Sequence, residues 1–210
     1  AFAPISESGI YERNDLNVPD QWAFASVFGR VNYNYKGKYF AEALFRSDGS
    51  SKFGENYKYG FFPAVSAGWV ITNEDFLKYN PTVSFLKLKA SFGINGNSNI
   101  PNGRTYNTYR ISNTGYNNQP YIYPDLRNNP NLRWETSNTF DIAVEYGLFG
   151  DRITGELAYY NKTTNDMLLN VTLQKANGFD NWWDNVGSVK NTGVELSINT
   201  RNVVGAKFKW

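Results

Sequence analysis

Three carboxylates within residues 139–161 come nearest to catalytic chemistry by their type and spacing: Asp141, Glu145 and Glu156. Two carboxyl groups about 5–10 Å apart can hydrolyse a glycosidic bond. Asp141 and Glu145 are separated by about 13 Å at the rise of a β-strand, which is too far for such a pair. Glu156 could approach one of them across a hairpin, so a glycosidase stays open as an alternative. The favoured interpretation is a wet, charged wall with no catalytic residue.

The segment that carries these carboxylates alternates apolar and polar residues, as a strand with one apolar face does. On its first arm, Phe140, Ile142, Val144 and Tyr146 alternate with Thr139, Asp141, Ala143 and Glu145. On the return arm, Ile153, Gly155, Leu157 and Tyr159 alternate with Thr154, Glu156, Ala158 and Tyr160. The pattern predicts an antiparallel hairpin over residues 139–161 with a turn at 147–152. Its apolar face could pack in a soluble sandwich or face lipid.

The same alternation recurs along the chain. It predicts strands at about residues 28–35, 38–46, 61–72, 86–92 and 194–199, with Lys87, Lys89 and Glu195 on the polar faces. Pro63 predicts a bulge or a strand start, and Asn73 is expected to cap a single helical turn. The connections at 47–60, 94–131 and 163–185 are long, and those between them are short. In a meander, this places every long loop on one rim, which is typical of an outer-membrane barrel.

Composition excludes several classes of function. Aromatic residues make up 17% of the 210 residues, and the net charge is only +2, so there is no basic footprint for nucleic acid. The chain has no cysteine and no histidine, which removes disulfides, thiolate chemistry and the usual zinc ligands. We therefore expect no metal and no cofactor. No apolar run approaches the roughly 20 residues of a transmembrane helix.

Aromatic residues in the predicted long loops are candidate ligand or partner contacts. Trp182 and Trp183 could stack on sugar rings or dock a partner, and Tyr121 and Tyr123 are further candidates. Packing within the loops or a membrane-interface girdle are the alternatives. Trp69, at a strand end, is expected in the periplasmic aromatic belt. The segment 48–51 lacks the spacing of a calcium loop or a P-loop, so turn chemistry is favoured there.

Several segments together resemble the barrel of the SusC/RagA-type TonB-dependent transporters. In order along the chain they are GRVNY at 29–33, RSDGSSKFG at 46–54, GFFPAVSAGW at 60–69, LKLKASFG at 86–93, NLRWE at 131–135, YYNK at 159–162, NVG at 185–187 and NTGVEL at 191–196. The resemblance covers about residues 22–200. Each segment alone is a weak signal, and the specificity comes from their combination and order.

The resemblance implies an all-β, antiparallel transmembrane barrel of roughly 22 strands with a plug, of which this chain would form an arc of about eight. We expect residues 1–210 to lie in one β-barrel domain, without a plug domain, TonB box or signal peptide, with a loop at 1–20 and a partial strand at 206–210. The implied function is active import of oligosaccharides or peptides across the cell outer membrane, energised by TonB, with a SusD-like surface lipoprotein as partner. The alternative is a soluble or surface β-sandwich that binds glycans without transport.

Overall fold

The computed structural model describes residues 21–112, 115, 119–174, 176, 178–179 and 181–203. The predicted loop at 1–20 and the predicted partial strand at 206–210 lie outside these residues. The described elements are β1 (Phe24–Tyr35), β2 (Tyr39–Ser50), the 3₁₀ helix η1 (Glu55–Tyr57), β3 (Tyr59–Phe61), β4 (Ala64–Val70), the 3₁₀ helix η2 (Ile71–Asn73), β5 (Val83–Asn97), β6 (Thr108–Ser112), β7 (Tyr121–Arg127), β8 (Glu135–Leu148), β9 (Ile153–Asn165), β10 (Leu168–Thr172), β11 (Asn181–Asn185) and β12 (Ser188–Thr200). Among them, no helix has the length and apolar character needed to cross a membrane.

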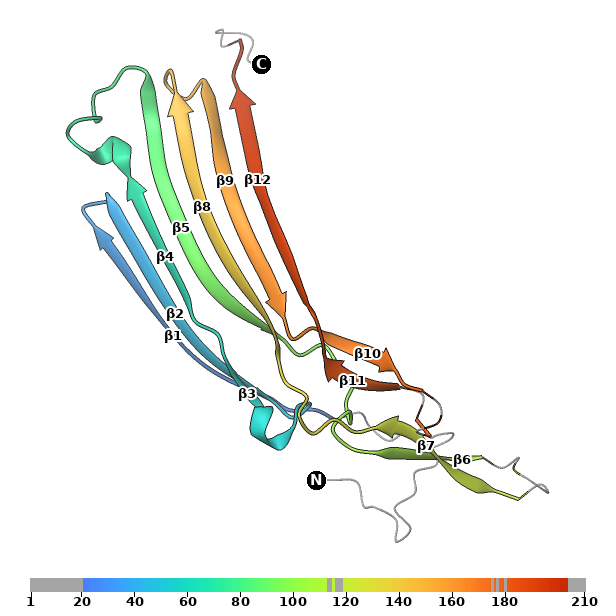
Figure 1. Cartoon of the computed structure of the whole chain (residues 1–210). Helices are drawn as coiled ribbons and strands as arrows, with labels where there is room; N and C mark the ends of the chain where they lie inside the picture. Colours follow the sequence, from blue (N-terminus) through green and yellow to red (C-terminus); the bar gives the residue numbers. More distant parts are fainter. Residues whose placement is uncertain are drawn as a thin grey trace.

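The long strands form one curved sheet, a single layer in which each strand pairs antiparallel with its neighbour (Figure 1). Its order is β1-β2-β4-β5-β8-β9-β12, and β3 also pairs with β2, which makes eight strands among the described residues. Figure 1 shows the short connections at one end of the sheet and the long ones at the other. The predicted alternation of short turns and long loops is therefore confirmed.

The β8–β9 hairpin keeps one register along its whole length, so its two apolar faces coincide. Ile142 lies opposite Tyr159, and Val144 lies opposite Leu157. Phe140 is 41% exposed, Ile142 38% and Leu157 48%. A sandwich would bury these side chains beneath a second sheet, but among the described residues the long strands form only one layer (Figure 1). The sandwich alternative therefore lacks the core that it requires.

The apolar face continues across the sheet to both of its edges. Directly paired residues point to the same side, so one row of this face runs across five neighbouring strands through Val31, Ala43, Val65, Phe92 and Phe140. The exposed apolar side chains of this face include Val31, Tyr33, Tyr35, Tyr39, Phe45, Val65, Phe92, Phe140, Ile142, Leu157, Tyr159, Val194, Leu196 and Ile198. A band this large on one side of a sheet requires an apolar environment.

The buried core of the described chain lies at the long-loop end, away from the middle of the sheet. It consists of Phe53, Phe62, Ile100, Leu132, Trp134 and Leu168, with Ile94 and Trp183 packed against it. Trp134 is the central ring, with centroids 5.0 Å from Phe53 and 5.2 Å from Phe62. Its indole N–H donates to the Lys58 carbonyl at 3.1 Å. Three connections that are distant in sequence are thereby fixed to one another.

Two of the predicted long loops contain strands of their own, which corrects the prediction of unstructured connections at 94–131 and 163–185. The strands β6, β7, β10 and β11 form a second sheet of order β10-β11-β7-β6. The pairing between β11 and β7 is parallel and joins Asn181 to Leu126 and Trp182 to Arg127. These strands have five to seven residues, and such short segments show too little alternation to be recognised.

Two local predictions are also refined by the structure. Pro63 directly precedes β4, so it marks a strand start, and β3 and β4 keep the same register with β2, which excludes a bulge there. Asn73 was expected to cap a helical turn, but its side-chain amide donates to the Gly37 carbonyl at 2.8 Å. The prediction of an Asn73 cap is therefore wrong. The Asn73 amide instead links η2 to the turn after β1.

Gly54 provides a test of the packing between loops. A Cβ built on Gly54 would lie 1.8 Å from the Pro130 carbonyl oxygen, whereas one on Gly29 would meet nothing within 4 Å. We expect Gly54→Ala to lower the unfolding free energy of the complete protein by about 1–3 kcal/mol. Gly29→Ala should change it by less than about 0.5 kcal/mol. Urea unfolding in vesicles measures both, and equal stability of the two variants would contradict this packing.

Candidate functional site

The polar face of the large sheet carries an open hollow of about 750 Å³. Residues that line it include Asn32, Glu42, Ser66, Lys89, Asp141 and Glu195. Asn32, Glu42 and Ser66 follow one another across three paired strands, and Ser91 and Asp141 continue the row. The hollow therefore follows from strand alternation, which places these polar residues on the side opposite to the apolar band.

An ion-pair cluster stands within this face. Lys89 Nζ lies 2.8 Å from Glu156 Oε2 and also contacts Glu145. Glu145 and Glu156 are directly opposite each other in the β8–β9 register, where like charges repel. The ammonium group between them offsets that repulsion. The three side chains are each about a third exposed, at 35% for Lys89, 29% for Glu145 and 39% for Glu156, so the cluster remains hydrated.

The remaining predicted polar residues lie on the same face without joining this cluster. Lys87 pairs in register with Glu145, and its Nζ lies 6.0 Å from the centre of the Phe40 ring. Asp141 accepts a hydrogen bond from Ser91 Oγ at 3.4 Å. Glu195 pairs in register with Ala158 on β9. The sequence therefore predicted the shared face of all six residues, but it did not predict that Lys89 joins Glu145 to Glu156.

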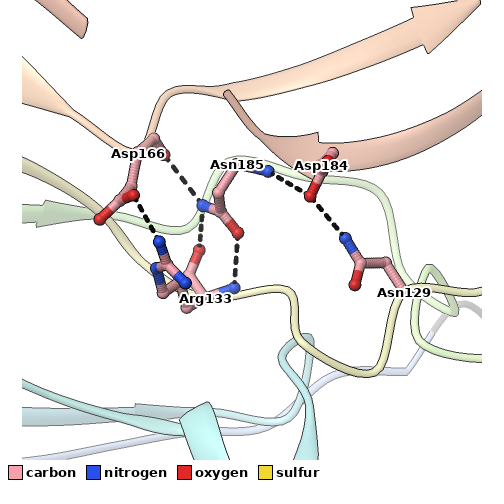
Figure 2. A network of polar contacts seen from close by, with 5 residues as sticks. All are labelled: Asn129, Arg133, Asp166, Asp184 and Asn185. Carbon is pink, nitrogen blue, oxygen red and sulfur yellow. Dashed lines mark hydrogen bonds and ion pairs between the residues drawn. The ribbon is translucent and has the colours of Figure 1, made fainter. Parts of the chain in front are cut away.

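The two longest loops are joined by a network of side-chain amides and carboxylates, shown in Figure 2. Asn129, which is buried, donates to the Trp183 carbonyl at 3.0 Å and to Asp184 Oδ1 at 2.8 Å. The Asn185 amide donates to the carbonyls of Arg133 and Asp166, at 2.8 and 2.9 Å. The loop after β5 and the loop after β9 are therefore held together as one platform.

Arg133 closes this network with an ion pair. Its guanidinium lies 2.7 Å from Asp166 Oδ1, and its backbone N–H donates to Asn185 Oδ1 at 2.9 Å. The hydrogen bond to Asp166 raises the pKa of Arg133 above its ordinary value. Arg133 belongs to the NLRWE segment and Asn185 to the NVG segment. Neither segment shows an alternating pattern, so no such pattern could have revealed the contact between them.

The predicted aromatic contacts separate into two groups. Trp183 packs against the buried core, whereas Trp182, its neighbour on β11, points to the other side of the strand by alternation. The Arg127 guanidinium carbon lies 4.9 Å from the centre of the Trp182 ring. On β7, the rings of Tyr121 and Tyr123 are 5.6 Å apart, and Tyr121 is exposed. The structure brings Trp182 to Arg127, but it does not bring the four aromatic residues into one cluster.

Sequence reasoning missed a cluster around Glu74 at the short-turn end of the sheet. The Glu74 carboxylate accepts hydrogen bonds from Tyr39 OH at 2.7 Å, Lys38 Nζ at 2.9 Å and Trp69 Nε1 at 3.1 Å. These bonds, with that of Tyr39 contributing most, lower the pKa of Glu74 to about 2. The rings of Tyr39 and Trp69 are stacked at 6.3 Å. Lys38 and Tyr39 are about 35 residues away from Glu74, so no local signal marks the cluster.

A family model described as the β-barrel of TonB-dependent receptor-like proteins matches residues 3–210. The chain belongs to this family. It is 45% identical over 188 residues to TonB-dependent receptor P26 of Formosa agariphila, covering 89% of this chain and 19% of that protein. It is 34% identical over 217 residues to TonB-dependent receptor SusC of Bacteroides thetaiotaomicron, covering 97% of this chain and 22% of that protein.

Solved structures of the RagAB peptide importer have the same fold. In the closed-closed state, the TM-score is 0.82 at 32% identity, over 90% of this chain and 21% of that chain. The chain thus spans about a fifth of the length of the relatives that it matches. The open sheet is therefore an arc of a TonB-dependent receptor barrel, as the resemblance implied. Its relatives are receptors and transporters, which favours transport over the glycosidase alternative.

The contribution of Lys89 to stability can be compared with that of Lys87, which lies on the same face of this receptor wall. Lys89→Met leaves Glu145 and Glu156 facing each other, so we expect a loss of about 1 kcal/mol in unfolding free energy. Lys87→Met, two residues away, removes an ammonium group that forms no ion pair with the described residues, so it should cost less than about 0.5 kcal/mol. Urea unfolding of the complete receptor in vesicles at low and high salt measures both. The Lys89 effect should shrink in high salt, and equal effects of the two substitutions would contradict the cluster.

The Glu74 cluster predicts a dependence of receptor stability on pH. The folded-state pKa of Glu74, about 2, lies below the ordinary value of 4.5. The stabilisation by the carboxylate is thus complete above about pH 4.5 and is lost as the pH falls toward 2. We expect Glu74→Gln to lower the melting temperature at neutral pH, and the difference from the unmodified receptor to narrow across this interval. Asp75→Asn is the control, and a Glu74→Gln difference that stays constant with pH would refute the cluster.

Proposed function

We propose that this chain forms part of the wall of an active importer for oligosaccharides or peptides in the cell outer membrane. The observation that carries the proposal is a single-layer sheet with an exposed apolar band on one face and a charged hollow on the other. This arrangement suits a barrel wall with lipid outside and water inside. Membership of the TonB-dependent receptor family supports the same assignment.

The positions of the loops give the proposed wall its direction. In outer-membrane barrels, long loops face the exterior and short turns face the periplasm. The platform of β6, β7, β10 and β11 would then lie at the cell surface, and the turn at residues 149–152 at the periplasmic rim (Figure 1). Asp141, Glu145, Glu156, Glu195, Lys87 and Lys89 would line the aqueous lumen. These six side chains carry charges of both signs, so this part of the lumen would be hydrated.

The proposed energy source and partner extend what the relatives suggest. Two relatives are named TonB-dependent receptors, and the solved neighbours are described as a peptide importer. We infer that the complete protein is energised through TonB and works with a SusD-like surface lipoprotein. The loop platform supports a partner at the mouth, because Arg133, Asn129 and Asn185 fix its two loops together and limit the ordering cost of binding.

Uptake by cells tests the proposed function. A strain that lacks the complete protein should lose uptake of a defined oligosaccharide or of a peptide mixture from the medium. Plasmid-borne protein should restore it, and removal of TonB should abolish it again. Loss of either substrate class fits the proposal and identifies the class. Unchanged uptake of both classes, with the protein shown to be in the outer membrane of the parent strain, would contradict it.

Substitution of the two adjacent tryptophans distinguishes contact with a ligand or partner from packing within the protein. We propose that Trp182, with Tyr121 and Tyr123, contacts the ligand or the lid protein, whereas Trp183 packs against the core. Trp182→Ala should reduce uptake and leave the unfolding free energy nearly unchanged. Trp183→Ala should lower the unfolding free energy by about 2 kcal/mol, because its ring is partly buried. If the Trp182→Ala variant is present at the cell surface in normal amount and uptake is normal, Trp182 does not belong to the site.

A further inference from the structure

The connection between β4 and β5 exposes two aromatic side chains at the short-turn end of the sheet. Phe76 is 73% exposed and Tyr79 86%. These values exceed those of the rings in the apolar band beside them, such as Tyr39 at 42%. Large aromatic side chains that are held almost fully exposed indicate a surface that contacts an apolar or interfacial partner.

Backbone hydrogen bonds give this segment a defined shape. The N–H groups of Leu77 and Lys78 donate to the Glu74 carbonyl at 3.0 and 2.9 Å, and the Asn80 N–H donates to the Leu77 carbonyl at 3.0 Å. Asn80 Oδ1 then accepts from Val83 N at 2.9 Å, where β5 begins. Residues 74–80 thus form a hydrogen-bonded turn without a regular helix, and both Phe76 and Tyr79 lie in it.

The Glu74 side chain fixes where the turn lies. Its carboxylate accepts hydrogen bonds from Tyr39 OH and Trp69 Nε1. Both rings belong to the apolar face, where they lie in one row with Leu88 and Val144. Tyrosine and tryptophan in such positions keep their polar tips at the level of lipid headgroups. The turn therefore starts at headgroup depth on the apolar side of the wall, where Phe76 and Tyr79 continue the band.

We propose that residues 74–79 form an interfacial anchor, in which Phe76 and Tyr79 enter the boundary between headgroups and acyl chains of the phospholipid leaflet at the short-turn rim. Lys78 Nζ lies 5.8 Å from the centre of the Tyr79 ring, which places beside this ring a cation that can bind a lipid phosphate. Continuity with the exposed apolar band favours lipid over a protein partner. The inference rests on the proposed membrane orientation of the wall.

Spin-label accessibility in vesicles tests the anchor. Single cysteines would be introduced as Phe76→Cys, Tyr79→Cys, Asp75→Cys and Ile142→Cys in the complete protein, with any other cysteine replaced by serine. Each labelled variant is inserted into phosphatidylethanolamine and phosphatidylglycerol vesicles, and its heat-modifiable band verifies folding. Power saturation then compares contact of each label with oxygen, which enters lipid, and with a water-soluble nickel chelate. Asp75 is the matched control on the same turn, and Ile142 reports the apolar band.

We expect the labels at positions 76, 79 and 142 to be more accessible to oxygen than to the nickel chelate. The label at position 75 should be more accessible to the nickel chelate. If the label at position 142 is accessible to oxygen, as expected for lipid contact, two results would contradict the proposed anchor. Nickel contact at 76 and 79 equal to that at 75 would place the rings in water, and shielding of both labels from both reagents would place them against protein. Nickel contact at 142 would instead contradict the membrane orientation, and with it the proposed function.

Discussion

Hydrogen bonding between neighbouring strands is the constraint on which the rest of this structure depends. In lipid, each backbone N–H and C=O group needs a partner, because no water is present to supply one. Between the edge strands β1 and β12, each long strand of the large sheet meets this requirement by pairing antiparallel with a neighbour on both sides. In the pairs of this large sheet the register is nearly uninterrupted, with a shift between Val83 and Phe85 where β5 begins. Continuous pairing lets one face remain apolar and exposed without a second layer.

The continuous register also determines the chemistry of the wall. Because paired residues share a face, the same ladder that aligns Ile142 with Tyr159 aligns Glu145 with Glu156. Two carboxylates are thus forced together, and Lys89 on the next strand lies within reach of both. The cluster is a consequence of strand pairing, and its partial exposure keeps the hollow wet. Beyond the ladder, buried packing around Trp134 and the Arg133 network hold the long loops in place.

Alternation over long strands made the wall predictable from the sequence. The faces of Phe140 to Tyr146 and of Lys87 and Lys89, the turn after Leu148 and the gathering of long loops at one end were all correctly predicted. The parallel pairing of β7 with β11 was not, because it joins short segments about 55 residues apart. Glu74 was missed for the same reason, since Lys38 and Tyr39 approach it only in the folded sheet. The candidate ligand contacts Tyr121, Tyr123 and Trp182 stay predictions.

The central claim, that the two faces of this wall meet lipid and water, is tested most directly by placing one charge on each face of β9. Leu157 lies in the apolar band, between Val144 and Leu196, and Ala158 lies on the polar face beside Glu195. The unfolding free energy of the complete protein in vesicles is the measurement. We predict that Leu157→Arg lowers it by about 2–4 kcal/mol, the cost of a cation facing the hydrocarbon near mid-membrane, and that Ala158→Arg leaves it nearly unchanged. Equal losses, or a larger loss for Ala158→Arg, would contradict the account.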